Sequence, residues 1–421
     1  MGFMTMKLDM SKTYDRVEWD FLLKLMRKMG FQRRWINLIS ACISTVTYSI
    51  LVNGEPNGNI TPTRGITQGD PIAPYLFLLC SEGLTGLIRQ AMQEKKIRGF
   101  SLCKGGPKIS HLFFADDSLF FCRAQMGDIQ SIQNILERYE RASGQQVNKS
   151  KAALFFSTNV STTTKHSIQE VLGIPEVKEY EKYLGLPAVV GKNKRAGLNF
   201  IKDRVWGKKK GWKEKLLSQA SKEILLKSVV QAISTFAMSC FKLPVGLCKD
   251  IKAMTRKFWW GQREDRRKIH WRKWEVLCKP KSEGEMGFKD LCRFNEAMLA
   301  KQVWRLIHDT NSLFYKVFTA KYFPNGSIFE AKQNSSSYAW KSILKARKVI
   351  SQGGLWRVGD GCKIRIFGDS WLTDNNGRRV IAPNNSLLGN STIDVLIDQH
   401  TRKWKQNLID SSFTPDEAIT D

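Results

Sequence analysis

The amino-acid sequence predicts an α+β fold that gives way to a mostly helical, basic region near residue 190. In the first part, short runs that alternate apolar and polar residues are interspersed with segments of helical period, and Gly, Pro and Asn clusters separate them. Beyond residue 190, helical periodicity continues while lysines and arginines accumulate. A chain of 421 residues can hold two or three structural units with substantial cores.

The composition points to a polyanionic partner. Apolar residues make up 42% of the chain and charged residues 25%, which excludes a wholly disordered chain. Sixty-seven Lys and Arg against 39 Asp and Glu leave a formal charge of +28. Because the excess is concentrated in particular stretches, nucleic acid is the first candidate partner. A soluble basic protein without such a partner is the alternative.

Cysteine usage and apolar runs predict an intracellular location without a membrane anchor. The nine cysteines form no Cys-x-x-Cys pair and have no histidine at zinc-finger spacing, as expected for reduced thiols. The apolar run near the start is short and is followed at once by charged residues, so no signal-peptide core is predicted. The sequence contains no stretch of 18 uncharged apolar residues, so no membrane span is predicted.

The first predicted unit is a strand, an acid and a helix. Residues 5–9 alternate into Asp9, as a short strand does, and from Ser11 the spacing is helical, with its apolar face at Val17, Phe21, Leu22 and Leu25. A second helix is predicted over residues 33–42.

A hairpin, a loop and a long helix follow. Asn53-Gly54 is a strong hairpin-turn signal between predicted strands 48–52 and 60–62. Residues 64–74 form a loop punctuated by Gly and Pro before an apolar helix over 75–91. Such a loop, leading into a helix N-terminus, can hold phosphates or a base.

Residues 111–121 predict a second hairpin whose tip carries Asp116 and Asp117, between the apolar arms Leu112–Phe114 and Leu119–Phe121. A helix over 128–142 ends at Gly144, a residue suited to the C-cap position. A strand over 152–156 completes the α+β part.

Two later segments are strongly basic. Nine Lys or Arg face one acid between residues 192 and 213, and ten face three acids between residues 256 and 281. The second segment also contains Trp259, Trp260, Trp271 and Trp274. The basic side chains can neutralise phosphates while the indoles either stack on bases or form core. Further along, helices are predicted around Trp304, and residues 353–361 predict a β-hairpin.

The adjacent acids at the predicted hairpin tip call for a positive partner, because two carboxylates a few ångströms apart repel each other. An Asp-Asp pair in an ordinary turn is the alternative. Asp9 ends the first strand, and strands that end side by side can bring a third carboxylate to the other two. Three hard oxygen ligands suit Mg²⁺. A pair of such ions can catalyse nucleotidyl transfer, which is the reaction that these acids indicate.

These segments resemble the reverse transcriptases of plant non-LTR (LINE-type) retrotransposons. Lys7–Trp19 resembles the first palm motif, Arg64–Phe77 the second and Phe114–Asp117 the third, in the family's order. Residues 142–150, 183–187, 257–261 and 294–301 resemble later segments. The resemblance covers about residues 1–375.

The resemblance implies a right-hand polymerase palm over residues 1–190, a helical basic thumb over 191–300 and a connection-like region over 301–421. It implies an RNA-directed DNA polymerase that extends a DNA primer with deoxynucleoside triphosphates on an RNA template, with Mg²⁺ or Mn²⁺ as cofactor. The implied catalytic and metal-binding residues are Asp9, Asp116 and Asp117, of which Asp117 is the less demanding.

The resemblance also implies substrate contacts. Tyr14 matches the aromatic residue under the sugar that excludes a 2′-hydroxyl; a core tyrosine is the alternative. Gln68 and Gly69 match the loop along the nascent base pair, for which an ordinary glycine turn is the alternative. Lys149 or Lys151 is expected to neutralise the triphosphate, unless it is simply a solvated surface lysine.

Only eight residues precede Asp9, so the fingers and an upstream endonuclease are expected to be missing, as are C-terminal zinc-binding and ribonuclease H-like segments. We therefore expect little or no polymerase activity from this chain alone. A non-catalytic nucleic-acid-binding remnant of a degenerate element is the second hypothesis, and a metal-dependent nuclease that uses the same acids is the third.

Overall fold

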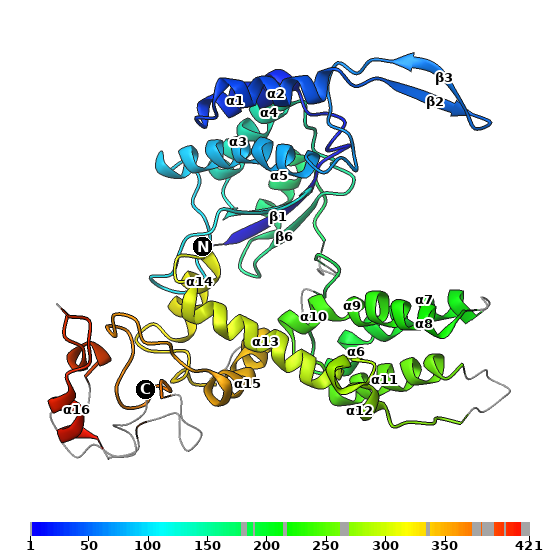
Figure 1. Cartoon of the computed structure of the whole chain (residues 1–421). Helices are drawn as coiled ribbons and strands as arrows, with labels where there is room; N and C mark the ends of the chain where they lie inside the picture. The colour runs from blue at the N-terminus through cyan, green and yellow to red at the C-terminus, as the bar shows by residue number, and fades with distance from the viewer. Residues whose placement is uncertain are drawn as a thin grey trace. The chain divides into compact units, whose positions relative to one another are not determined.

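The computed structural model describes residues 2–177, 183–187, 190–213, 217–261, 269–333, 337–372, 380, 391–399 and 401–413. The chain forms two compact units (Figure 1). The N-terminal unit comprises residues 1–181 and 316–321, and the C-terminal unit comprises residues 182–315 and 322–421.

The N-terminal unit is built from an antiparallel sheet, a separate hairpin and five helices, which confirms the predicted α+β class. The strands are β1 (Phe3–Asp9), β2 (Tyr48–Val52), β3 (Glu55–Ile60), β4 (His111–Phe114), β5 (Asp117–Arg123) and β6 (Ala153–Phe156). The helices are α1 (Trp19–Lys28), α2 (Arg33–Ser44), α3 (Ala73–Gln93), α4 (Met126–Ser143) and α5 (Thr162–Leu172).

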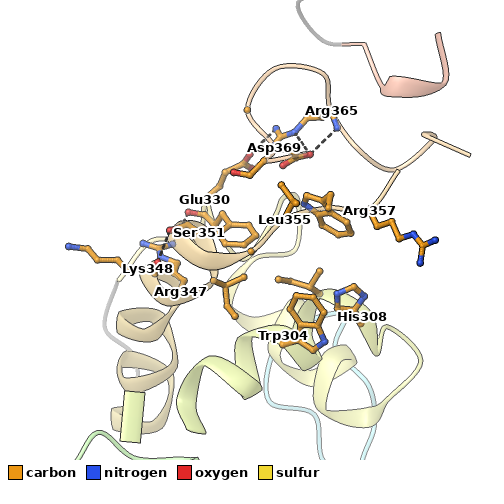
Figure 2. Close-up of a pocket in the computed structure, with 17 residues that line it drawn as sticks. Trp304, His308, Glu330, Arg347, Lys348, Ser351, Leu355, Arg357, Arg365 and Asp369 are labelled. Carbon is orange, nitrogen blue, oxygen red and sulfur yellow. Dashed lines mark hydrogen bonds and ion pairs between the residues drawn. The ribbon is translucent and has the colours of Figure 1, made fainter. Parts of the chain in front are cut away.

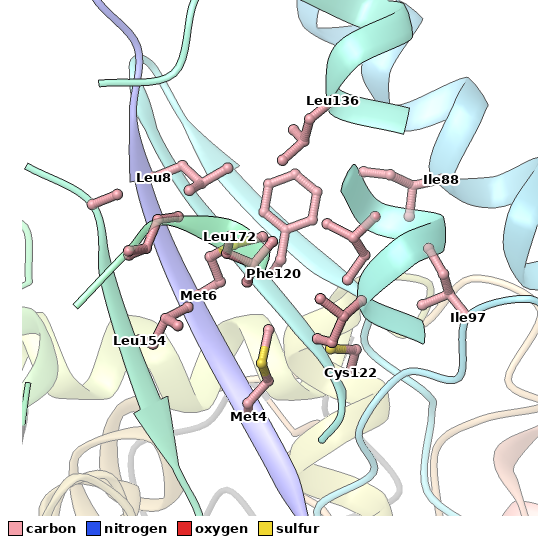
Figure 3. Close-up of a cluster of buried hydrophobic side chains, with 14 of the residues drawn as sticks. Met4, Met6, Leu8, Ile88, Ile97, Phe120, Cys122, Leu136, Leu154 and Leu172 are labelled. Carbon is pink, nitrogen blue, oxygen red and sulfur yellow. The ribbon is translucent and has the colours of Figure 1, made fainter. Parts of the chain in front are cut away.

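The four-stranded sheet has the order β4-β5-β1-β6, and each neighbouring pair is antiparallel. Alternate residues of β1 point to opposite faces. Met4, Met6 and Leu8 are buried and form a core face with residues of the neighbouring strands and of helices α3, α4 and α5 (Figure 3). Thr5, Lys7 and Asp9 point to the other side and are only partly buried. We call this second side the open face.

The predicted helix from Ser11 is wrong for its first turns. Residues 11–16 form turns, and α1 begins at Trp19. Lys12 has a left-handed φ of 45°, and the Thr13 hydroxyl donates to the Met10 carbonyl at 3.0 Å. The backbone of this segment also bonds to distant segments, as in Glu18 N–H to Ser143 O at 3.0 Å. Tertiary hydrogen bonds therefore outweigh the local helical pattern.

A second core joins α1 and α2 to the first half of α3. The hairpin of β2 and β3 leaves this body, and every residue of both strands is exposed (Figure 1). Its turn is at Asn53-Gly54, as predicted, and both residues have positive φ values of 53° and 89°. The second strand begins at Glu55 rather than at residue 60, because pairing starts directly after the two-residue turn.

The C-terminal unit is mostly helical in the part of the chain that the structure describes. Its helices are α6 (Lys194–Leu198), α7 (Phe200–Lys213), α8 (Gln219–Leu225), a one-turn π-helix (Leu226–Val230), α9 (Gln231–Ile233), α10 (Thr235–Cys240), α11 (Val245–Trp259), α12 (Trp274–Leu277), α13 (Leu291–His308), α15 (Tyr338–Gly353) and α16 (Gln406–Ser412). Helix α14 (Leu313–Tyr322) is divided between the two units. Two short 3₁₀ turns cover Lys281–Glu283 and Ile393–Leu396.

The predicted β-hairpin at residues 353–361 is wrong. Helix α15 continues to Gly353, and residues 354–361 form no strand. The segment bonds instead to a later loop, where the Trp356 N–H donates to the Ser370 carbonyl at 2.7 Å. Its apolar residues pack into a small core with Ile364, Ile366 and Leu396. The glycines allow this irregular path.

All nine cysteines are free thiols, and burial raises the pKa of Cys80 to about 12.

Across the described residues, no helix has both the length and the apolar character needed to cross a bilayer.

Candidate active site on the open face of the sheet

The open face brings together acids that are far apart in the sequence. Asp9 ends β1, and Asp117 begins β5 directly opposite it in the antiparallel register. Residues paired in this way lie on the same face with Cα atoms about 5 Å apart. Asp116 is exposed in the two-residue turn between β4 and β5, next to Ala115, which has a φ of 49°. The predicted hairpin is thus present, and of its two acids it is Asp117 that lies opposite Asp9.

Each of the opposed acids has a lysine beside it. Lys7 Nζ lies 3.4 Å from Asp117 Oδ1, and Lys151 Nζ lies 3.6 Å from Asp9 Oδ2. The carboxylates are about three-quarters buried, with side-chain exposures of 23% for Asp9 and 27% for Asp117. Two like charges opposite each other on a strand pair are destabilising. The two ammonium groups offset that repulsion.

This pair of carboxylates has the donor chemistry that a hard divalent ion prefers. Within the described ranges, no three His, Cys, Asp or Glu side chains are gathered closely enough to hold a metal ion by themselves. Mg²⁺ commonly binds through one or two carboxylates together with water and substrate phosphates. Two opposed carboxylates, already balanced by positive charge, therefore fit such an ion.

Tyr14 belongs to the turn segment over residues 11–16, and its ring packs against helix α3. Its ring is partly buried, and its centroid lies 5.6 Å from that of Phe77. Its carbonyl accepts a hydrogen bond from Ile66 N–H at 3.0 Å, and Val17 O accepts one from Gly65 N–H at 2.8 Å. The first two sequence motifs are therefore joined through their backbones. A Cβ at Gly65 would lie 2.8 Å from Asp15 O, so this contact requires glycine.

Gln68 and Gly69 follow this junction on an exposed loop. Gln68 lines a cavity of about 310 Å³ together with Asp15, Tyr48 and Arg64. Gly69 has a φ of 98°, which favours glycine, and the space beside it is open. The loop thus presents a side-chain amide and an uncrowded backbone at the surface.

The segment after α4 brings lysines to the sheet. Asn148 N–H donates to Asp9 O at 2.8 Å, and Met10 pairs with Val147 in an antiparallel bridge. Lys151 reaches Asp9, as described above. Lys149 is exposed, and its ammonium group lies beside Gly173 at the end of α5. Of the two candidate lysines, Lys151 is the one that contacts a predicted site residue.

The tryptophans of the basic segment have different environments. Trp259 and Trp274 are buried, and each stacks or packs on Phe288. Trp260 stacks on His270 with ring centroids 6.0 Å apart, whereas Trp271 is 77% exposed. Two of the four tryptophans, Trp259 and Trp274, are therefore buried core residues. The basic residues Arg263, Arg266, Arg267 and Lys268 lie outside the described residues.

Comparisons with known proteins place part of the chain in a known family. The family described as reverse transcriptase (RNA-dependent DNA polymerase) matches residues 3–188. An uncharacterised mitochondrial protein of Arabidopsis thaliana is 41% identical over 145 residues, which are 34% of this chain and 94% of that protein. An Arabidopsis thaliana protein named for ribonuclease H is 35% identical over 178 residues, covering 41% of this chain and 28% of that one.

A further relative is a retrovirus-related Pol polyprotein from a type-1 retrotransposable element R2 of Popillia japonica. It is 29% identical over 154 residues, which are 37% of this chain and 24% of the polyprotein. The chain thus spans about a quarter of the length of the two longer relatives.

The chain belongs to the reverse transcriptase family. Its similarity to a Pol polyprotein of a retrotransposable element agrees with the non-LTR type that the motifs predicted.

Two features of the structure escaped the sequence prediction. Lys7 contacts Asp117, and the available signal was its position two residues before Asp9, which places both side chains on one face of a strand. An aromatic cavity around Trp304 and Trp356 in the C-terminal unit was also missed. Its lining comes from four separate segments, so no local pattern marks it.

Proposed function

We propose that this chain acts as an RNA-directed DNA polymerase domain, which joins a primer 3′-hydroxyl to a deoxynucleoside triphosphate on an RNA template. The observation that carries the proposal is the register of β1 and β5, which sets Asp9 opposite Asp117 beside a turn that holds Asp116. These residues come from two motifs more than a hundred residues apart. Their meeting on an open, polar face supports a shared task.

Asp9, Asp116 and Asp117 are the residues that would hold Mg²⁺ or Mn²⁺. When bound, such ions supply positive charge that favours a deprotonated primer hydroxyl and neutralises the leaving phosphate. Lys7 and Lys151 place positive charge beside the two carboxylates and so offset their mutual repulsion in the absence of other cations. Lys151 also offers its ammonium group to a triphosphate, and Lys149 is a further cation on the same segment.

Substrate positioning is assigned to the joined motifs. The Tyr14 ring is held against Phe77, which suits a rigid barrier against a 2′-hydroxyl. Gln68 and Gly69 offer hydrogen bonds and close backbone approach to the nascent base pair. The basic helices over residues 191–300 form the thumb that holds the nucleic-acid backbone, and residues 301–421 form the connection-like region.

Single-nucleotide incorporation tests the proposal. The full chain is incubated with an RNA template, a DNA primer, deoxynucleoside triphosphates and Mg²⁺, and Asp116→Ala is compared with the original chain. Incorporation that the substitution abolishes supports the polymerase. Asp20→Asn, which changes an exposed acid of α1 paired with Lys24, is the matched control and should retain incorporation.

A second measurement does not need activity. Fe²⁺ bound in place of Mg²⁺ reduces added hydrogen peroxide to hydroxyl radicals, with ascorbate to regenerate Fe²⁺, and these radicals cut the nearest backbone, so cleavage is expected beside residue 9 and residues 116–117. Retention on nucleic acid with neither incorporation nor localised cleavage would overturn the proposal in favour of the non-catalytic remnant. Template degradation without primer extension would favour the nuclease.

A further inference from the structure

A cavity in the C-terminal unit has the features of a nucleotide-binding pocket. Its volume is about 740 Å³, within the range of small-molecule sites, which is roughly 300–1,000 Å³. Helices α13 and α15 and the loops at residues 329–330, 354–357 and 365–370 line it (Figure 2). All of these residues belong to one compact unit.

Flat aromatic rings line one side. Trp304 and His308 lie one turn apart on α13, with ring centroids 4.1 Å apart, and Trp356 lies 5.8 Å from His308. Trp304 is nevertheless 47% exposed. A large indole left half in water inside a concave site is suited to stacking on a planar ligand.

A polar group faces these rings across the cavity (Figure 2). The Arg365 guanidinium lies 3.4 Å from Glu330 Oε1 and 3.7 Å from Asp369 Oδ2, and its backbone N–H also donates to Asp369 at 2.9 Å. Carboxylates and a guanidinium together can accept from an amino group and donate to a ring nitrogen or carbonyl. These are the groups on the edge of a nucleobase.

The walls of the cavity are fixed before any ligand binds. Arg347 Nη1 donates to three carbonyl oxygens of the loop after α14, those of Ile328, Phe329 and Ala331, at 3.1, 2.8 and 2.8 Å. The Trp356 N–H holds the Ser370 carbonyl on the opposite loop. A preformed site loses less entropy on binding.

The charge of the lining selects the class of ligand. Four cationic side chains and two acidic ones line the cavity: Arg347, Lys348, Arg357, Arg365, Glu330 and Asp369. An aromatic cage that binds a methylated ammonium group would instead need more acidic than basic side chains. Lys348 and Arg357 are exposed and extend away from the centre at opposite ends of the view in Figure 2. A strand that crosses the cavity would meet a cation on either side of the inserted base.

We propose that this pocket binds one unstacked nucleotide of a single-stranded nucleic acid, with its base against Trp304 and the flanking phosphates near Lys348 and Arg357. The proposal shares with the proposed function only the nucleic-acid partner, and it requires neither a metal ion nor the palm carboxylates. RNA and DNA strands share this chemistry, so both are tested.

Photocrosslinking locates the bound base. Short single strands of RNA and of DNA, each with one 5-iodinated pyrimidine, are irradiated with the full chain in excess chelator and raised salt, and crosslinked peptides are identified by mass spectrometry. Crosslinks are expected at Trp304 or Trp356. If one strand type, RNA or DNA, gives the higher crosslinking yield, that type is the natural ligand of the pocket. Equal yields indicate that the pocket accepts a nucleotide of either type.

Matched variants test the stacking. Trp304→Ala should weaken crosslinking in the pocket about tenfold, as expected for the loss of one stacked base, whereas Trp304→Phe should retain most of it. Trp35→Ala is the control, since Trp35 is 46% exposed on α2 in the other unit. Because the chelator removes the metal ion that the polymerase reaction requires, crosslinking in the pocket under these conditions separates this proposal from the polymerase assignment.

An exposed rim residue provides a variant that should not affect folding. Arg357→Gln should reduce the slope of log affinity against log salt by about 0.7, the value for one phosphate of a single strand. Crosslinks confined to other segments, or pocket yields unchanged by both Trp304→Ala and Arg357→Gln in chains with unaltered circular dichroism, would overturn the proposal.

Discussion

The two faces of strand β1 differ in what their residues do. Met4, Met6 and Leu8 are buried under helices, whereas Thr5, Lys7 and Asp9 alternate with them on the open face. The core face can be filled by any apolar set of suitable volume. The open face depends on charge and register, since Asp9 must meet Asp117. One seven-residue strand therefore separates the stability of the palm from its proposed chemistry.

The sharpest test of this separation is Asp9→Asn. We expect primer extension to fall about a thousandfold, equal to ~4 kcal/mol, because a metal-binding charge is lost. The free energy of unfolding should change by less than about 1 kcal/mol, since the Lys151 contact is partly exposed. Incorporation assays and urea unfolding measure the two. A large loss of stability with unchanged incorporation would contradict the separation.

Met6→Ala should have the reverse effect. Met6 is fully buried, so removal of its side chain should lower the free energy of unfolding by about 2 to 5 kcal/mol. Thr5→Ala, one residue away on the open face, should change it by less than about 1 kcal/mol. Urea denaturation of both variants is the measurement. Equal losses would show that the faces do not differ in their contribution to stability.

Gly144 joins the core helix α4 to the turn segment that carries Tyr14. It caps α4 with a φ of 75°, and a Cβ there would overlap the Arg16 carbonyl oxygen. Gly30 after α1 has a φ of 87° with open space around it. Gly30→Ala should cost about 1 kcal/mol in strain, and Gly144→Ala should cost about 1 to 3 kcal/mol more because of the overlap. Similar unfolding midpoints would contradict the close contact.

At neutral pH the smallest expected effect concerns a titratable residue at the edge of the core face. Burial, with a smaller contribution from the charge of Arg89, lowers the pKa of His111 to about 4. The unfolded residue has a pKa of about 6.5. The unfolded chain therefore binds more protons between these values, and the free energy of unfolding should fall as pH drops from about 6.5 to 4.

His111→Gln provides the comparison. It cannot titrate, so its unfolding curve should lose less stability over that interval than the original chain loses. The difference between the two chains in denaturant titrations at several pH values is the quantity to measure. Parallel pH profiles would show that His111 is not protected from water.

Much of the palm could be predicted from the sequence because its signals are local. The Asn53-Gly54 turn, the hairpin at residues 111–121 and the Gly144 cap each follow from backbone preferences of a few residues. The helix predicted from Ser11 failed because hydrogen bonds to residues 143–146 hold that backbone in turns. The hairpin predicted at residues 353–361 failed because its partner is the loop near Ser370. In both cases the hydrogen-bonding partner lies outside the local stretch of sequence from which the element was predicted.

The sequence by itself determined the α+β class and the family, and it singled out the three acids that we propose as metal ligands, since motif order and strand periodicity are properties of neighbouring residues. Only the tertiary structure decided that Asp117 is the acid directly opposite Asp9, that Lys7 and Lys151 balance these charges, and that Trp304 and Trp356 share a cavity. The reason is physical: register, ion pairs and cavities depend on which distant segments meet, and that choice minimises the free energy of the whole unit.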